Sequence, residues 1–176
     1  MEAEAVCLYT YECRLVPGLL QTKAYARASF LNQVPALEDE QIEAQLAARL
    51  ERQRLLRERP NTSYSFILEE HVLLRRIGGD TVASELVGHL LDVSRLRNVE
   101  IQIMPVVRED HAGLHGPLQL LETQEHRWFA YVEGQESGQF ITDPNVVSTL
   151  QRRYARMRSQ ALSLQDSLDL LQRMRG

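Results

Sequence analysis

The sequence predicts an α+β fold in which a mostly antiparallel sheet packs against helices and a helical pair ends the chain. Three observations support this prediction. Short segments alternate apolar and polar residues with the two-residue period of a strand, and longer segments repeat apolar residues at helical spacing. The predicted strands cluster, whereas the end of the chain is helical, an order typical of α+β folds. A length of 176 residues, 44% of them hydrophobic and 25% charged, fits a single domain over residues 1–176.

The first part of the chain predicts one strand and two helices. β-favouring side chains alternate over residues 5–12, which predicts a strand. The proline and glycine of Val16–Gly18 then break the regular pattern. We expect a helix within residues 19–32, with Thr22 as its N-cap. The clearest helix covers residues 38–58, because its acidic first turn and arginine-rich last turns suit the helix dipole.

A strand and two helical segments are predicted next. Residues 63–68 predict a strand, and residues 69–76 predict one or two helical turns. Gly78 and Gly79 then predict a turn. A helix to about Leu91 is expected after it, with Asp80 or Thr81 as its N-cap.

Four further strands follow. Residues 99–104 form a β-branched apolar run, residues 117–122 and 128–133 alternate as an antiparallel hairpin, and residues 139–142 add a short strand.

The last two predicted helices begin at recognisable caps. Asp143 precedes Pro144, the usual order of an N-cap and a first helical residue, so a helix to about residue 162 is expected. Ser163 is placed to cap a helix over residues 164–175. One side of that helix is apolar and predicts packing on the core, or docking of a partner or a second copy: Leu164, Leu168, Leu171 and Met174.

The loop His111–Pro117 is the segment around which we expect a binding site. Two glycines, a proline and two histidines cannot continue a strand ladder, so an irregular loop joins the strands on either side. Polar residues on a loop held by a rigid scaffold are typical of binding sites.

A metal site at this loop is disfavoured. His111 and His115 have a spacing found in half of many zinc sites, but a zinc site needs at least three protein ligands. The other soft ligands, His126, Cys7 and Cys13, form no second half-motif. We therefore predict no metal and no cofactor.

No catalytic residue is assigned from the sequence. Glu69, Glu70 and His71 could suggest acid–base chemistry, but an acidic helix start explains them more simply. The chain has no nucleophile elbow and no phosphate-binding glycine loop.

Charge and composition restrict the partners. A net charge of −4 and a pI near 5.8 argue against direct nucleic-acid binding. Residues 49–59 look like a solvated mixed-charge helix face, whereas residues 152–158 are more basic and could meet an acidic partner. No apolar run is long enough to span a bilayer. Cys7 and Cys13 suggest free thiols in a reducing cytoplasm.

An ordered set of motifs resembles the C-terminal, antitoxin-like domain of bacterial XRE-type helix-turn-helix transcriptional regulators. The motifs are Met1–Ala5, Val16–Thr22, Tyr25–Arg27, Ala48–Gln53, Gly78–Gly79, His111–Pro117, Leu120–Glu122 and Tyr131–Glu133. The resemblance implies a domain that binds a partner or a ligand. Its recurrent residues correspond to Pro17, Gly18, Gln21, Thr22, Tyr25, His111, Gly113, Gly116 and Glu133.

The resemblance implies that this chain starts where the second domain of such regulators starts, so we expect the DNA-binding helices to be missing from it. It is expected to be either an excised C-terminal fragment or a stand-alone relative that lost DNA binding.

The leading hypothesis is a non-catalytic regulatory domain that binds a small protein partner or a small-molecule effector. The expected ligand-binding residues are His111, His115, Glu133, Glu70, Arg75, Gln21 and Tyr25. The alternative is a stand-alone relative that acts as a ligand-binding enzyme or cyclase in specialised metabolism. Its acids and bases would come from Glu70, Arg75, His111, His115 and Glu133. A third hypothesis is dimerisation through the last two helices.

Overall fold

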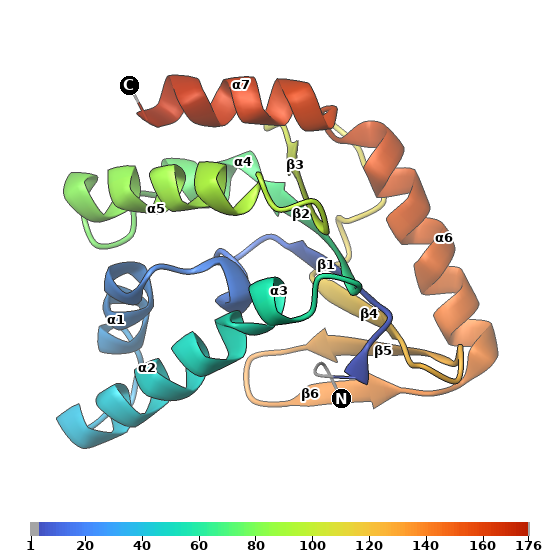
Figure 1. The fold of residues 1–176 in the computed structure, drawn as a ribbon, viewed down its shortest axis with the longest axis horizontal. Helices are drawn as coiled ribbons and strands as arrows, with labels where there is room; N and C mark the ends of the chain where they lie inside the picture. Colours follow the sequence, from blue (N-terminus) through green and yellow to red (C-terminus); the bar gives the residue numbers. More distant parts are fainter. Residues whose placement is uncertain (1–3, 176) are drawn as a thin grey trace.

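The computed structural model describes residues 4–175, so Met1 to Ala3 of the first resemblance motif and Gly176 lie outside it. The described residues contain one six-stranded sheet. The sheet lies between helices (Figure 1). The elements in chain order are β1 (Cys7–Glu12), η2 (Gly18–Leu20), α1 (Lys23–Leu31), α2 (Asp39–Gln53), α3 (Leu55–Glu58), β2 (Ser63–Glu69), α4 (Glu70–Leu74), α5 (Asp80–Val93), β3 (Val99–Met104), β4 (Leu118–Glu122), β5 (Trp128–Glu133), β6 (Gly138–Ile141), α6 (Pro144–Gln160) and α7 (Leu164–Arg175).

The sheet is mixed, with strand order β3-β2-β1-β4-β5-β6. β1 pairs with β2, and β2 with β3, in parallel; the pairs β1–β4, β4–β5 and β5–β6 are antiparallel. The parallel pairs arise because helices connect these strands and return the chain to the same end of the sheet. The predicted α+β class and the predicted hairpin are confirmed, and the antiparallel pairs are three of the five in the described residues.

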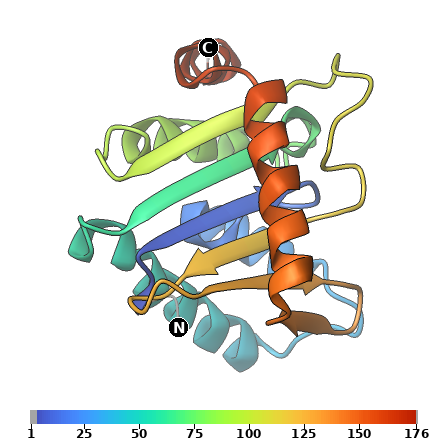
Figure 2. The same ribbon diagram turned by 90° about the vertical axis from the view of Figure 1, so that its right-hand side faces the viewer.

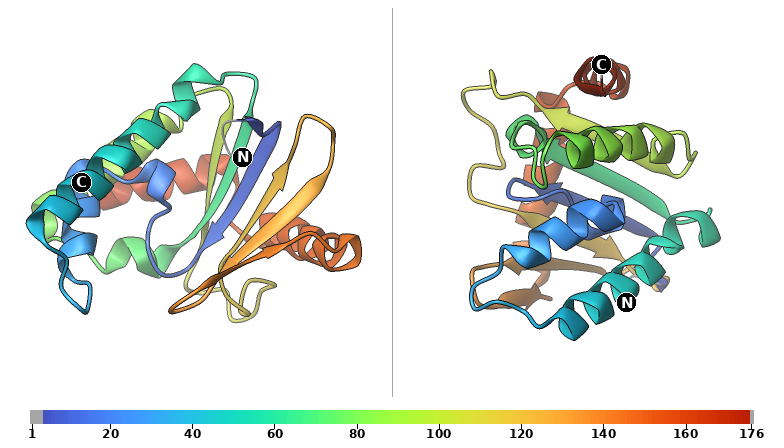
Figure 3. Two further views of the ribbon diagram at one scale, coloured as in Figure 1. Left: turned by 90° about the horizontal axis from the view of Figure 1, so that it is seen from below. Right: turned by 90° about the vertical axis from the view of Figure 1, so that its left-hand side faces the viewer.

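Helices cover both faces of the sheet. Figures 2 and 3 show α1, α2 and α5 on one face and α6 crossing the other. α7 packs on α5 and on the edge strand β3. The predicted C-terminal helical pair is therefore present, but its two helices cover different parts of the molecule.

Local capping explains where several helices begin. The hydroxyl of Thr22 accepts a hydrogen bond from the N–H of Tyr25, and the carboxylate of Asp143 accepts one from the N–H of Asn145. Ser163 caps α7 in the same way. These three predicted caps are confirmed. The cap predicted at Asp80 or Thr81 is wrong, because Gly79 occupies the N-cap position of α5 without a side-chain hydrogen bond.

The single helix predicted over residues 38–58 is divided at Arg54 into α2 and α3. Leu46 in α2 packs against α1, whereas Leu56 in α3 packs with the main core. The division lets the two helices bury their apolar residues against different neighbours.

Alternating side chains of the strands build a core on each face of the sheet. Phe66 and Leu68 of β2 pack on the side of α5, and Ile67 between them packs on the side of α6. In α7, Leu171 is fully buried, while Leu168 and Met174 pack partly against the α5 side of the core. The apolar stripe of α7 therefore packs within this chain, apart from the exposed Leu164.

No helix among residues 4–175 is both long and apolar enough to cross a membrane.

Candidate functional site

Two adjoining cavities, of about 350 and 610 Å³, open at the end of the sheet where β1 and β5 end. Helix α2 faces this end of the sheet and contributes to both walls. We call the two cavities together the β1–α2 cleft. They share six wall residues: Glu12, Arg14, Pro17, Gly18, Arg49 and Glu133.

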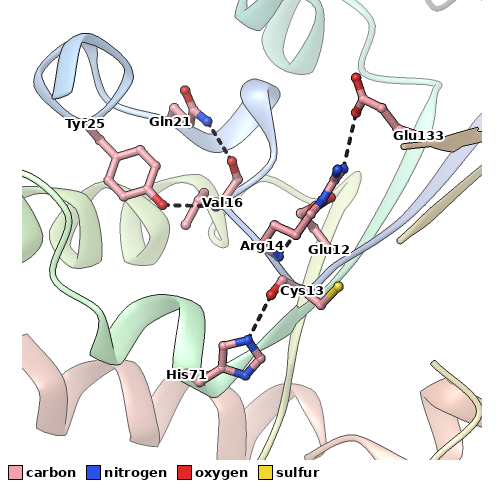
Figure 4. A network of polar contacts seen from close by, with 8 residues as sticks. All are labelled: Glu12, Cys13, Arg14, Val16, Gln21, Tyr25, His71 and Glu133. Carbon is pink, nitrogen blue, oxygen red and sulfur yellow. Dashed lines mark hydrogen bonds and ion pairs between the residues drawn. The ribbon is translucent and has the colours of Figure 1, made fainter. Parts of the chain in front are cut away.

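Arg14 forms two exposed ion pairs at the rim of the cleft. Its guanidinium lies between two carboxylates, with Nε 3.0 Å from Glu12 Oε1 and Nη2 3.3 Å from Glu133 Oε2 (Figure 4). The contact to Glu133 joins the end of β1 to the end of β5. Because the side chains of Arg14 and Glu133 are 43% and 56% exposed, this pair contributes little to stability and can open at small cost.

Arg49 is the half-buried cation of the cleft. Its guanidinium carbon lies 4.7 Å from the centre of the Phe30 ring, and its Nη1 donates a hydrogen bond to Gln21 Oε1 at 2.8 Å. Among residues 4–175, no carboxylate lies within ion-pair distance of Arg49. Burial, with the nearby charge of Arg52, lowers the pKa of Arg49, while the charge of Glu133 opposes this. The charged form is therefore disfavoured by its surroundings.

The segment between β1 and α1 is fixed by side chains. The amide N–H of Gln21 donates to the carbonyl of Val16 at 2.7 Å, and the hydroxyl of Tyr25 accepts a hydrogen bond from the N–H of Val16 at 3.2 Å (Figure 4). Gln53 of α2 donates to the carbonyls of Gly18 and Gln21. These bonds satisfy backbone groups that a turn leaves without partners, so this wall of the cleft is preorganised.

The opposite wall comes from β4 and β5. Gln119 and Tyr131 are cross-strand neighbours there, and both line the smaller cavity. The ring of Tyr131 lies over Gly138, where a Cβ atom would overlap its hydroxyl end. Gly138 thus allows Tyr131 to lie against β6.

The two predicted residues that reach the cleft wall are Gln21 and Glu133, and Tyr25 supports that wall from behind. Gln21 and Tyr25 are only 2% and 1% exposed, so their role is to hold the wall in place.

His111 lies elsewhere, in a buried polar cluster. Its Nε2 is 2.8 Å from Glu69 Oε1, and the same oxygen accepts a hydrogen bond from the hydroxyl of Tyr11 at 2.7 Å. The N–H of Gly113 donates to Nδ1 of His111, so the ring proton belongs on Nε2 and points at Glu69. Both ring nitrogens of His111 therefore have hydrogen-bond partners within this chain. Burial and the bond to Glu69 raise the pKa of Tyr11.

The loop 111–117 thus closes over the sheet instead of lining the cleft. Gly113 lies directly on Tyr11 and Met157, since a Cβ atom at this position would come within 2.6 Å of the Tyr11 ring and 2.7 Å of the Met157 sulfur. Only Pro117, at the end of this loop, reaches the smaller cavity. We expected the loop His111–Pro117 to form the binding site, but the cleft is lined by other segments and only Pro117 of this loop reaches it.

The other predicted residues do not join the cleft wall. Glu70 accepts a hydrogen bond from the N–H of Val106 at 2.8 Å and so fixes the exit from β3. Arg75 and His115 are exposed at other places on the surface. Among the described residues, no group of three histidine, cysteine or acidic side chains is arranged to hold a metal ion.

Sequence reasoning missed the arginines that define the site. Arg49 lies in a run of arginine and glutamate that is typical of a solvated helix face. One signal was present: Arg49 belongs to the Ala48–Gln53 motif of the resemblance, and so does Gln53, which holds the wall.

The fold and the cleft define an α+β domain with a polar pocket at one end of a mixed sheet. A family model described as "Domain of unknown function (DUF5753)" matches residues 1–173, and the chain belongs to this family. Neither the curated proteins nor the solved structures gave a match.

Proposed function

We propose that this chain is a non-catalytic regulatory domain that binds a small-molecule effector in the β1–α2 cleft. The observation that carries the proposal is the construction of the cleft. Hydrogen bonds from the buried Gln21 and the half-buried Gln53 hold its wall, and charged side chains line a volume suited to a small molecule. Preformed concave sites with a few convergent polar groups are typical of ligand-binding sites.

The regulatory part of the proposal rests on the resemblance to the effector-binding or partner-binding domain of XRE-type regulators. The cytoplasmic location belongs to the same proposal, and the two free thiols, Cys7 and Cys13, support it.

The geometry favours a binding role over the enzyme alternative. Acid–base catalysis requires its groups to converge on one substrate. His111 is buried against Glu69, Glu70 bonds the backbone of Val106, and only Glu133 of the alternative's five residues lines the cleft.

A thermal-shift screen of small metabolites against the full chain tests the proposal. At about 100 times its dissociation constant, a ligand should raise the melting temperature by about 5–10 °C. Ser29→Trp places a large ring in the larger cavity, because Ser29 is a half-buried wall residue on α1. We expect this variant to lose the ligand-dependent shift. Ala155→Trp, on the exposed side of α6, is the matched control and should keep it.

Two results would contradict the proposal. One is a screen in which no compound stabilises the chain. The other is a set of ligands that stabilise the Ser29→Trp and Ala155→Trp variants equally, because such ligands would bind outside the cleft.

A further inference from the structure

The charge of Arg49 has no carboxylate within ion-pair distance among residues 4–175. A half-buried guanidinium without a carboxylate partner is costly, because burial removes water from a full positive charge. The Phe30 ring, the Gln21 amide and the more distant charge of Glu133 offset part of this cost, but no carboxylate of the described residues lies within ion-pair distance. Arg14, in contrast, already has two carboxylate partners. An anion entering the cleft therefore gains more at Arg49 than at Arg14.

The guanidinium of Arg49 is also held in a fixed orientation. Gln21 uses Nη1, and the Phe30 ring lies 4.7 Å from the guanidinium carbon. Within residues 4–175, Nε and Nη2 of Arg49 make no hydrogen bond. These two groups form the edge of the guanidinium that binds a carboxylate or phosphate with two parallel hydrogen bonds.

Gly18 keeps this edge accessible. A Cβ atom at Gly18 would lie 3.3 Å from Nε of Arg49 and 3.6 Å from its guanidinium carbon. Gly18 and Arg49 line both cavities, so the missing side chain leaves space for a ligand beside Nε. This observation is independent of the charge argument and points to the same place.

We propose that the effector carries an oxyanion, a carboxylate or a phosphate, which the Nε and Nη2 groups of Arg49 bind beside Gly18. This inference rests on the proposed function and names the chemistry of its ligand. Glu12 and Glu133 at the other side of the cleft repel a second negative charge, so a single anionic group fits best.

The test compares anionic probes with neutral counterparts that lack the charged group. Benzoate is paired with benzamide, and glucose 6-phosphate with glucose, so the two pairs separate carboxylate from phosphate binding. The readout is the Nε–Hε signal of Arg49 by NMR during titration of the full chain at constant ionic strength. We expect at least one anion to shift this signal saturably, and its neutral counterpart to bind at least about tenfold more weakly.

Three variants separate this role from a purely structural one. Arg49→Lys keeps a positive charge but removes the two parallel hydrogen-bond donors of the guanidinium. Gly18→Ala keeps the charge but places a methyl group against Nε of Arg49. Both should weaken the binding of the anion about tenfold or more. Arg153→Gln removes an exposed arginine on α6 and should leave the affinity unchanged.

The possible outcomes are distinct. Equal binding of each anion and its neutral counterpart, or no effect of Arg49→Lys, overturns the oxyanion inference. If the metabolite screen still finds ligands that Ser29→Trp abolishes, the proposed function survives that result. If no ligand of any charge depends on the cleft, both proposals fail.

Discussion

The side chains of Arg49 and Gln21 are joined by a hydrogen bond of 2.8 Å that links α2 to the segment between β1 and α1. Gln21 is buried, and its amide also donates to the carbonyl of Val16 at 2.7 Å. One amide therefore satisfies a backbone carbonyl and orients a guanidinium. This double use explains why a polar side chain is buried at this position.

Replacing Gln21 with Met removes both hydrogen bonds at nearly constant volume. We expect the free energy of unfolding to fall by about 1–3 kcal/mol, because the Val16 carbonyl loses its partner in a buried place. Gln124→Met, in the exposed turn between β4 and β5, should change it by less than about 0.5 kcal/mol. Urea unfolding measures both values. Equal midpoints for the two variants would show that the Gln21 bonds contribute nothing.

Two glycine-to-alanine substitutions should have opposite effects. Gly113→Ala places a Cβ atom against Tyr11 and Met157, so we expect a loss of about 1–3 kcal/mol from overpacking. Gly88→Ala lies within α5, where the new Cβ meets the Arg175 side chain at 3.5 Å, an ordinary contact. It should gain up to about 1 kcal/mol from helix propensity. Thermal or urea unfolding of the two variants tests these expectations. A Gly113→Ala variant as stable as the parent chain would contradict the close packing of the loop.

The buried Glu69 cluster should be sensitive to loss of a single hydroxyl. Tyr11→Phe deletes the 2.7 Å hydrogen bond to Glu69 and leaves the carboxylate with the His111 contact. We expect a loss of about 1–3 kcal/mol in the free energy of unfolding. Tyr131→Phe, on the wall of the cleft, should cost less than about 0.5 kcal/mol. If both variants unfold at the same urea concentration as the parent, Tyr11 does not stabilise Glu69.

Local chemistry explains which parts of the fold could be predicted from the sequence. The caps at Thr22 and Asp143 depend on neighbours within three residues, so the sequence contains the whole signal. The short, largely apolar runs of β1 and β2 likewise reflect two faces that are both buried against helices. The parallel pairing of β1, β2 and β3 was missed, although helices between successive strands are the usual sign of a parallel sheet.

The site depends on contacts between distant segments, which explains why it was largely missed. Arg49 and Gln21 are 28 residues apart, and Arg14 and Glu133 are 119 residues apart. The sequence places His111 in a loop, but its partner Glu69 belongs to β2. No local sequence pattern predicts the contact between them. Tertiary packing, not periodicity, decides which polar residues are buried together.

The stability of the chain should fall on the acid side of neutrality because of His89. Burial, assisted by the charge of Arg57, lowers the pKa of His89 from its ordinary value of 6.5, while Asp92 and Glu85 oppose this. The unfolded chain then binds a proton near pH 6.5 that the folded chain resists. The contribution of neutral His89 to stability is therefore present above pH 6.5 and is lost as the pH falls from there toward the lower folded pKa.

His89→Gln should flatten this acid dependence between about pH 7 and 5, whereas His115→Gln, at an exposed position, should leave it unchanged. Urea unfolding at several pH values gives the slope of stability against pH. The same slope in the parent and in His89→Gln would show that another group is responsible.

The most direct test of the account is to map where a stabilising ligand binds. Backbone amide signals of the full chain, recorded by NMR during titration with the tightest ligand from the metabolite screen, locate the contact. We predict that the largest shifts fall at Gly18, Gln21 and Arg49, with further shifts near Glu133. Shifts confined to the loop 111–117, or to α5 and α7, would place the ligand elsewhere and contradict the β1–α2 cleft as the binding site.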